Sequence, residues 1–238
     1  MGAVAAFTLI LRTAIVTRPS LTYFGDAGVD IVIPTMARVI ALYAELLLLP
    51  IQLCPFYDWF LVPPSPALDG QALLGFLLFL ATILTIVTLR KRSPALVTSL
   101  AWLVLALSPV MQLVPLLNVA AERFLYLPSV GFCLALGILL NRSFDRYPKP
   151  TIALATVLIC LYSARTLWRW PDWRNDQTLN QATARDFSTP TPQINLAQLA
   201  AAQGNQAQAL RHLEAAERLA PGWPVPAKLR AKLLVPAK

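Results

Sequence analysis

Long apolar runs separated by short polar connections dominate residues 1–170 of the chain. A helix needs about 20 predominantly apolar residues to cross the hydrocarbon core of a bilayer, and several of these runs approach or exceed that length. The connections between them hold prolines, aromatic clusters and most of the charged residues. The pattern predicts an all-α polytopic membrane protein of about six spans, near residues 1–17, 36–52, 71–89, 95–117, 125–140 and 151–167.

The pattern changes in residues 171–238, where Gln, Asn and Ala become frequent and the apolar positions follow an amphipathic helical period. Residues 190–221 have the spacing of one tetratricopeptide repeat, a pair of antiparallel helices. Gln193 stands where this repeat usually has a tryptophan. Because about three repeats are needed for independent stability, we expect the unit to pack on the preceding helix, the membrane domain or a partner protein. Its predicted packing and turn positions are Ala197, Gly204, Ala209, Ala216 and Pro221.

The net charge of +8 does not indicate nucleic-acid binding, because the basic residues are scattered among connections. Basic connections of membrane proteins stay in the cytoplasm. The other predicted side, which includes the C-terminal tail, therefore lies outside, in the periplasm of a bacterial inner membrane or in the ER lumen. The composition, poor in lysine, favours the bacterial membrane. Arg18, Arg38, Arg90, Lys91, Arg92, Arg142, Arg146 and Lys149 fall on the predicted cytoplasmic side, and Arg123 alone falls in the short connections of the other.

Metal and cofactor chemistry are not indicated by the sequence. Cys54, Cys133 and Cys160 lie in or beside apolar runs without paired spacing, and His212 is the only histidine. We expect the cysteines to be small buried hydrophobes, with no metal site and no cofactor. A glycine-rich phosphate loop is missing as well.

Two pairs of charged residues lie in or beside apolar runs, where ionisable groups are costly and often functional. Arg38 and Glu45 share one face of the second predicted span. Glu122 and Arg123 fall between the fourth and fifth spans. Each pair has a structural alternative, in which the charges only tie a helix or loop to its neighbours.

The second pair belongs to the stretch Glu122-Arg-Phe-Leu-Tyr-Leu-Pro-Ser-Val-Gly-Phe-Cys133, which resembles the signature of the transmembrane and tetratricopeptide-repeat protein O-mannosyltransferases and their bacterial relatives. Trp173-Arg-Asn175 before the repeat unit is also similar to that family. The resemblance implies a membrane glycosyltransferase of the GT-C type, which takes a sugar from a polyprenyl phosphate. It implies that Arg123 binds the lipid phosphate, that Glu122 orients Arg123, and that Tyr126 donates a hydrogen bond to the phosphate.

Such enzymes carry an acidic motif in their first external loop, and residues 1–17 contain no acidic residue. We therefore expect the chain to be glycosyltransferase-like but to lack the catalytic N-terminal half, and no catalytic base is assigned. The main alternative is a non-enzymatic membrane scaffold whose repeat unit binds a protein partner. A third possibility is a transporter or lipid-linked oligosaccharide ligase that uses Glu45 and Arg123.

Overall fold

The computed structural model describes residues 24, 27–55, 57–112 and 118–234. The first predicted span, residues 1–17, and the C-terminal end of the fourth, residues 113–117, lie outside this part of the chain. Within the described residues the regular structure is helical, apart from one isolated bridge between Tyr57 and Ala120. The all-α prediction is thus confirmed.

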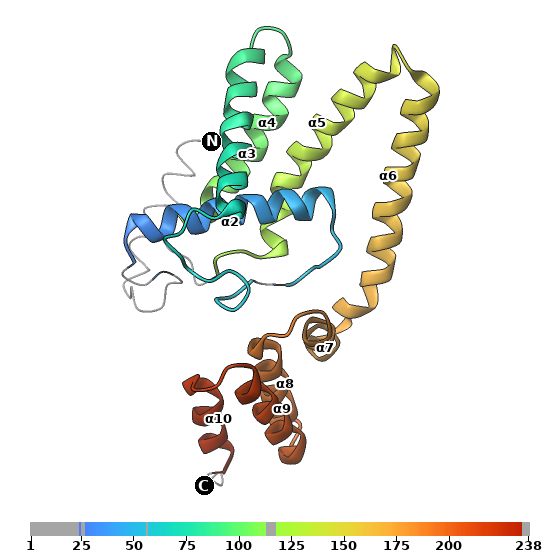
Figure 1. The fold of residues 1–238 in the computed structure, drawn as a ribbon. Helices are drawn as coiled ribbons and strands as arrows, with labels where there is room; N and C mark the ends of the chain where they lie inside the picture. Colours follow the sequence, from blue (N-terminus) through green and yellow to red (C-terminus); the bar gives the residue numbers. More distant parts are fainter. Residues whose placement is uncertain (1–23, 25–26, 56, 113–117, 235–238) are drawn as a thin grey trace, which may run out of the picture. The chain divides into compact units, whose positions relative to one another are not determined.

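The chain divides into two compact units, Met1–Cys160 and Leu161–Lys238, each described here by itself. The sequence pattern predicts a division after residue 170, whereas the observed one falls inside a long helix. Figure 1 shows the elements of the first unit: α2 (Val29–Leu48), α3 (Gly70–Leu89), α4 (Pro94–Leu107), α5 (Tyr126–Phe144) and the first part of α6 (Pro148–Arg169), with short 3-10 helices η2 (Ser108–Val110) and η3 (Glu122–Leu125).

Among the residues that the structure describes, four segments are long and apolar enough to cross a membrane, namely Val29–Leu48, Gly70–Leu89, Glu122–Phe144 and Pro148–Arg174. The apolar segment Pro94–Val110 is shorter. These segments coincide with the second to sixth predicted spans, so the protein is a helical membrane protein. The main difference is at α2, which begins at Val29 instead of residue 36, so Asp30 lies in its first turn.

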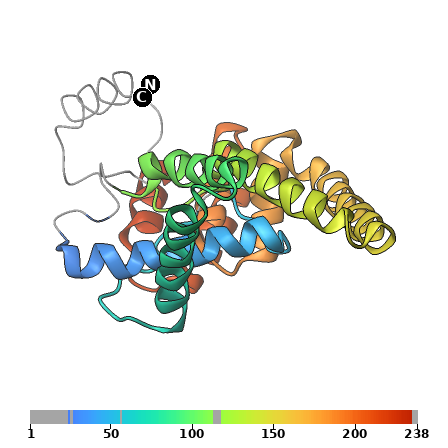
Figure 2. The same cartoon turned by 90° about the horizontal axis from the view of Figure 1, so that it is seen from above.

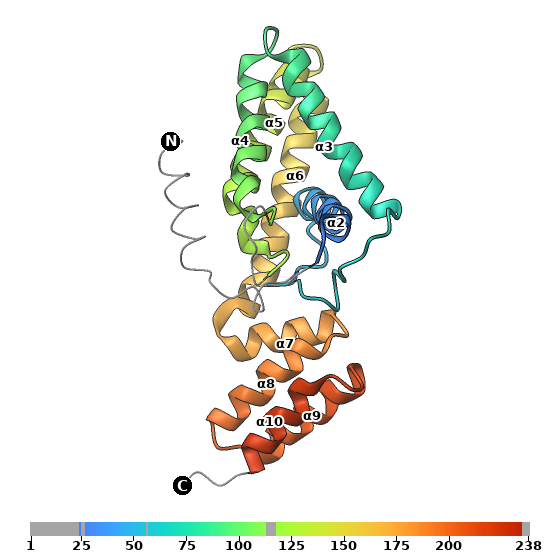
Figure 3. The ribbon, with the colours of Figure 1, turned by 90° about the vertical axis from the view of Figure 1, so that its left-hand side faces the viewer.

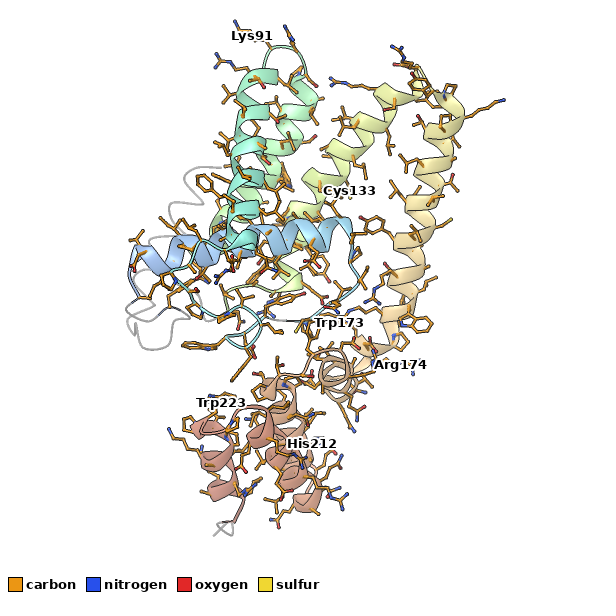
Figure 4. The ribbon with its side chains drawn as sticks, viewed as in Figure 1. Lys91, Cys133, Trp173, Arg174, His212 and Trp223 are labelled. Carbon is orange, nitrogen blue, oxygen red and sulfur yellow. The ribbon has the colours of Figure 1, made fainter. Side chains whose placement is uncertain are left out.

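The two most basic connections lie at one end of the α3–α5 group. Arg142, near the end of α5, donates a hydrogen bond to the Ser93 hydroxyl, which precedes α4. Arg90, Lys91 and Arg92 form the turn just before Ser93, and Figure 4 labels Lys91 at its tip. The prediction that these two connections share a side therefore agrees with their contact.

Helices α4 and α5 pack with their backbones in close contact. A Cβ atom added at Gly131 would lie 2.6 Å from the Ser99 carbonyl oxygen and 2.8 Å from the Leu103 nitrogen. The Trp102 indole N–H, on α4, donates a hydrogen bond of 2.9 Å to the Leu127 carbonyl on α5. Glycine permits this approach, in the way that small residues do between membrane helices.

Helix α2 runs in a different direction from α3, α4 and α5. It is seen at full length in Figures 1 and 2 and end-on in Figure 3, whereas α3, α4 and α5 extend lengthwise in Figures 1 and 3. A Cβ added at Gly75, in the second turn of α3, would overlap the Ala37 carbonyl and lie 3.1 Å from the Ala41 nitrogen. The middle of α2 therefore crosses the N-terminal end of α3 in backbone contact.

The second unit contains η4 (Trp170–Arg174), α7 (Asp176–Asp186), α8 (Pro190–Ala202), α9 (Gln206–Leu219) and α10 (Pro224–Leu234). Helices α8 and α9 form the expected antiparallel pair. Gly204 adopts φ +77° at the turn, a conformation that favours glycine. Ala197, Ala209 and Ala216 are fully buried, and α9 ends at Leu219, just before Pro221.

Both neighbours of the α8–α9 pair are helical. On one side, Asn195 of α8 donates a 2.8 Å hydrogen bond to the Asn180 side chain of α7. On the other side, Trp223, Val225, Leu229 and Leu233 of the α10 segment pack against the core of Ile194, Ala197, Leu213 and Ala216. The tail is thus a stack of four helices with its own apolar core.

A polar pair occupies the position where the repeat usually has its tryptophan. The Oε1 atom of Gln193, on α8, lies 2.8 Å from Nδ1 of His212 on α9, which Figure 4 labels. Partial burial lowers the pKa of His212 below its usual value. The neutral ring can therefore link the two helices near physiological pH.

Candidate functional site

The three residues just before Glu122 are fully buried. Val119, Ala120 and Ala121 are each 0% exposed. The backbone N–H of Tyr57 donates a hydrogen bond of 2.9 Å to the Ala120 carbonyl and forms the isolated bridge. Burial on this scale fixes the point at which η3 begins.

Tyr43, in the middle of α2, also lies against this segment. Its side chain is 1% exposed and lies near the Ala121 backbone and the charge of Arg123. The hydroxyl makes no hydrogen bond of normal geometry with any residue that the structure describes.

Two of the predicted residues, Arg123 in η3 and Tyr126 at the start of α5, lie at the surface directly after this buried segment. Arg123 is exposed, and its guanidinium carbon lies 5.2 Å from the centre of the Phe124 ring. Tyr126 is 74% exposed. Tyr126 is the first residue of α5, and its backbone N–H donates to the Arg123 carbonyl. Positions three apart in such a turn share one side, so Arg123 and Tyr126 lie on the same side of the junction of η3 and α5. Glu122 is half-buried and interacts within the chain.

Arg38 is held by an ion pair at the start of α3. Its guanidinium lies 2.9 Å from the Asp69 carboxylate and donates to the carbonyls of Pro63 and Ala67 at 3.4 and 3.2 Å. Asp69 also caps α3 by accepting a 2.9 Å hydrogen bond from the Ala72 N–H. The hydrogen bond from Arg38, and secondly that from Ala72, holds the pKa of Asp69 below its usual value.

This ion pair corrects the predicted side of Arg38. Asp69 precedes α3, whereas Arg90 follows it, so the two residues mark opposite ends of the same 20-residue helix. Arg38 therefore lies at the end opposite the basic turn and does not belong with Arg90, Lys91 and Arg92. Glu45, on the same helix as Arg38, is exposed.

Three residues of this region escaped the sequence analysis: Tyr43, Tyr57 and Asp69. The capping role of Asp69 could have been predicted, because an aspartate directly before an apolar run is a typical helix cap. The two tyrosines had none, since their contacts with residues 118–121 join segments far apart in the chain. Glu122, Arg123, Tyr126, Arg38 and Asp69 all lie at the end of the spans away from the basic connections.

Arginine and tyrosine side chains of this kind can bind an anion. A guanidinium group can bind a phosphate through two parallel charge-assisted hydrogen bonds, and a phenol can add a third. Lysine could not reproduce this paired geometry. The buried residues 119–121 fix the backbone position from which the Arg123 side chain extends.

Comparison with known proteins gives relatives of one kind. The chain is 35% identical over 136 residues to the protein O-mannosyl-transferase Tmtc2 of Drosophila melanogaster. This match covers 56% of this chain and 14% of the relative. It is 31% identical over 159 residues to Tmtc3 of the same fly, with 61% and 17% covered. It is 41% identical over 66 residues to human TMTC2, with 26% and 8% covered.

The chain thus spans less than a fifth of the length of these relatives. No family model matches it, and no solved structure matches it at comparable significance. The resemblance noted at Glu122 to Cys133 is nevertheless supported by similarity that extends over more than half of the chain in two relatives. In its matched part, the chain is similar to the Tmtc protein O-mannosyl-transferases.

Proposed function

We propose that this chain is the membrane portion of a glycosyltransferase-like protein that uses a polyprenyl-phosphate sugar, and that Arg123 binds the lipid phosphate. The observation that carries the proposal is the exposed guanidinium of Arg123 on a fully buried backbone segment at the end of the spans. A carrier phosphate lies at this level of a bilayer, because its isoprenoid chain occupies the hydrocarbon core. The relatives are named protein O-mannosyl-transferases, which supports the glycosyltransferase-like part of the proposal.

Each neighbouring residue has a part in this proposal. Tyr126, on the same side of the junction of η3 and α5 as Arg123, donates a hydrogen bond to a phosphate oxygen. Glu122 orients Arg123. As the glycosidic bond breaks, charge grows on the departing phosphate, and fixed cationic donors stabilise it. We assign no general base among the described residues.

The sidedness of the site follows from the charges. Under the positive-inside rule, the end with Arg90, Lys91, Arg92 and Arg142 faces the cytoplasm. The proposal therefore places Arg123 and the C-terminal tail on the other face, in the periplasm of a bacterial inner membrane. The α8–α9 pair is proposed to be a tetratricopeptide unit that binds a protein, in keeping with its spacing and buried alanines.

Binding of a radiolabelled short-chain polyprenyl phosphate to the purified full chain tests the role of Arg123. Arg123→Ala is expected to weaken binding at least tenfold, because hydrogen bonds to charged groups contribute about 1.5–3 kcal/mol each. Arg123→Lys keeps the charge but loses the paired geometry, so its affinity should be intermediate. Arg92→Ala, an exposed arginine in the basic turn, should bind as the unchanged protein does.

The matched alcohol, polyprenol, separates phosphate binding from adhesion to the isoprenoid chain. We expect polyprenol to bind weakly and to be insensitive to Arg123→Ala. Equal binding of the phosphate by the Arg123→Ala variant and the unchanged protein, with both correctly folded by size-exclusion chromatography, would refute the assignment.

A membrane scaffold is the second candidate, and the core of the four-helix tail favours it. Helices α8 to α10 pack around apolar residues of their own, as in a protein-binding module. In this case, deletion of residues 190–221 is expected to remove a crosslinkable partner in the native membrane while polyprenyl-phosphate binding stays unchanged. If the deletion leaves every crosslinked species in place, the scaffold hypothesis is contradicted.

A further inference from the structure

Helix α2 has the length and composition of a membrane span but not the direction of one. With 20 apolar-rich residues it qualifies by hydropathy. However, it extends across the direction shared by α3, α4 and α5, as Figures 1 and 3 show. The contacts of α2 show at which point along α3 and α5 it crosses these two helices.

Three contacts fix that point. Arg38, in the middle of α2, pairs with Asp69, the residue that caps the beginning of α3. Ala37 and its neighbours meet Gly75, in the second turn of α3. Tyr43 lies near the backbone of Ala121, just before η3 and α5 begin. The middle of α2 therefore meets the N-terminal ends of both α3 and α5.

This position conflicts with a membrane-crossing α2. A 20-residue helix is about 30 Å long, which matches the thickness of the hydrocarbon core. If α3 crosses the core, Asp69 marks its boundary, and the middle of α2 lies at that boundary too. A spanning α2 would have its middle at the centre of the bilayer. We infer that α2 lies along the lipid–water interface, on the same side as Arg123.

The faces of α2 have the chemistry that an interfacial helix needs. Arg38 points to the chain carbonyls before α3, on the water side. Val29 and Leu47 each lie about two and a half turns from Arg38, hence on the opposite face. Val29 is 70% exposed, and Ile33, one turn beyond it, is 56% exposed. Met36 and Tyr43, in the middle of this face, are buried within the chain, and membrane lipid covers the exposed end at Val29 and Ile33.

The polar face is continued by Glu45, which lies about two turns from Arg38, on the same side of the helix, and is exposed. The connection after α2 adds two exposed aromatic residues, Trp59 at 58% and Phe60 at 40%. Aromatic side chains of this kind prefer the membrane interface. A carboxylate at Glu45 thus faces water and need not be buried in hydrocarbon.

This inference concerns topology and stands apart from the proposed binding of lipid phosphate. It replaces the second predicted span by a surface helix. As a consequence, Asp30 at the start of α2 lies on the same side of the membrane as Trp59. A crossing α2 would place these two residues on opposite sides.

Cysteine labelling of the full chain in sealed membrane vesicles distinguishes the two arrangements. Cys54, Cys133 and Cys160 are first replaced by alanine, and a membrane-impermeant maleimide is then applied to single-cysteine variants. Trp59→Cys and Lys91→Cys, at opposite ends of α3, calibrate the two sides. Asp30→Cys is the reporter, and Ala27→Cys is a second reporter should the first reduce expression.

We expect Asp30→Cys to be labelled from the side that labels Trp59→Cys, with at least a tenfold preference over the other side. Labelling together with Lys91→Cys would overturn the inference. Protection of both reporters from both sides would overturn it as well, because an interfacial helix leaves its charged positions in water. None of these outcomes depends on whether Arg123 binds a phosphate.

Discussion

Replacing Gly75 with alanine is expected to lower the stability of the first unit by about 3 kcal/mol, because overpacking a tight contact typically costs 1–3 kcal/mol and this contact involves backbone. The new Cβ would overlap the Ala37 carbonyl and lie 2.7 Å from the Ala37 carbonyl carbon. A side-chain rotation cannot relieve such an overlap, so α2 and α3 must separate. Thermal unfolding in detergent, followed by size-exclusion chromatography, should show a midpoint lower by roughly 10 °C.

Gly137→Ala provides the matched control. Gly137 is also a helical glycine of a predicted span, in α5, but a Cβ added there would meet nothing within 4 Å. Alanine favours a helix over glycine by about 1 kcal/mol, so this variant should be as stable as the unchanged protein or more so. Equal midpoints for Gly75→Ala and Gly137→Ala would show that α2 and α3 do not make the described contact.

Replacing Leu213 with alanine is expected to destabilise the tail by about 2–5 kcal/mol, the usual cost of removing a buried leucine side chain. Leu213 is 0% exposed and lies at the centre of the core that joins α8, α9 and α10. Loss of its side chain leaves a cavity between these helices. Limited trypsin digestion of the full chain should then cleave at Arg211 and Arg218 much faster.

Leu219→Ala is the appropriate control, because it makes the same change in the same helix at a side chain that is 41% exposed. We expect its cleavage rate to stay close to that of the unchanged protein. If Leu213→Ala resisted trypsin equally well, the packing of α9 against its neighbours would be disproved. Under the scaffold alternative, Leu213→Ala should also weaken capture of the partner.

The site was only partly predictable from its residues. Glu122, Arg123 and Tyr126 are contiguous in sequence, so their proximity needed no knowledge of the fold. The contacts that bury the backbone before Glu122 could not be predicted, because Tyr43 and Tyr57 come from distant parts of the chain. Pairing between distant segments depends on packing, which a hydropathy pattern does not encode.

The direction of α2 is the clearest example of this limit. Its hydropathy satisfies the length and composition of a span, which would place Arg38 with the basic connections. The Arg38–Asp69 pair and the Gly75 contact place the middle of the helix at the end of α3 instead. Hydropathy measures how much apolar surface a segment carries, but not the angle at which neighbouring helices hold it.

The sequence by itself determined the helical class, five of the apolar segments, the shared end of the two most basic connections and the antiparallel pair of the tail. These follow from local composition and period, because segment length and apolar spacing decide whether a helix suits lipid or a small core. The tertiary structure alone decided the transverse course of α2, the partner of Arg38 and the burial of the segment before Glu122. Each of these depends on close contacts between residues separated by tens of positions, which form only when the helices pack.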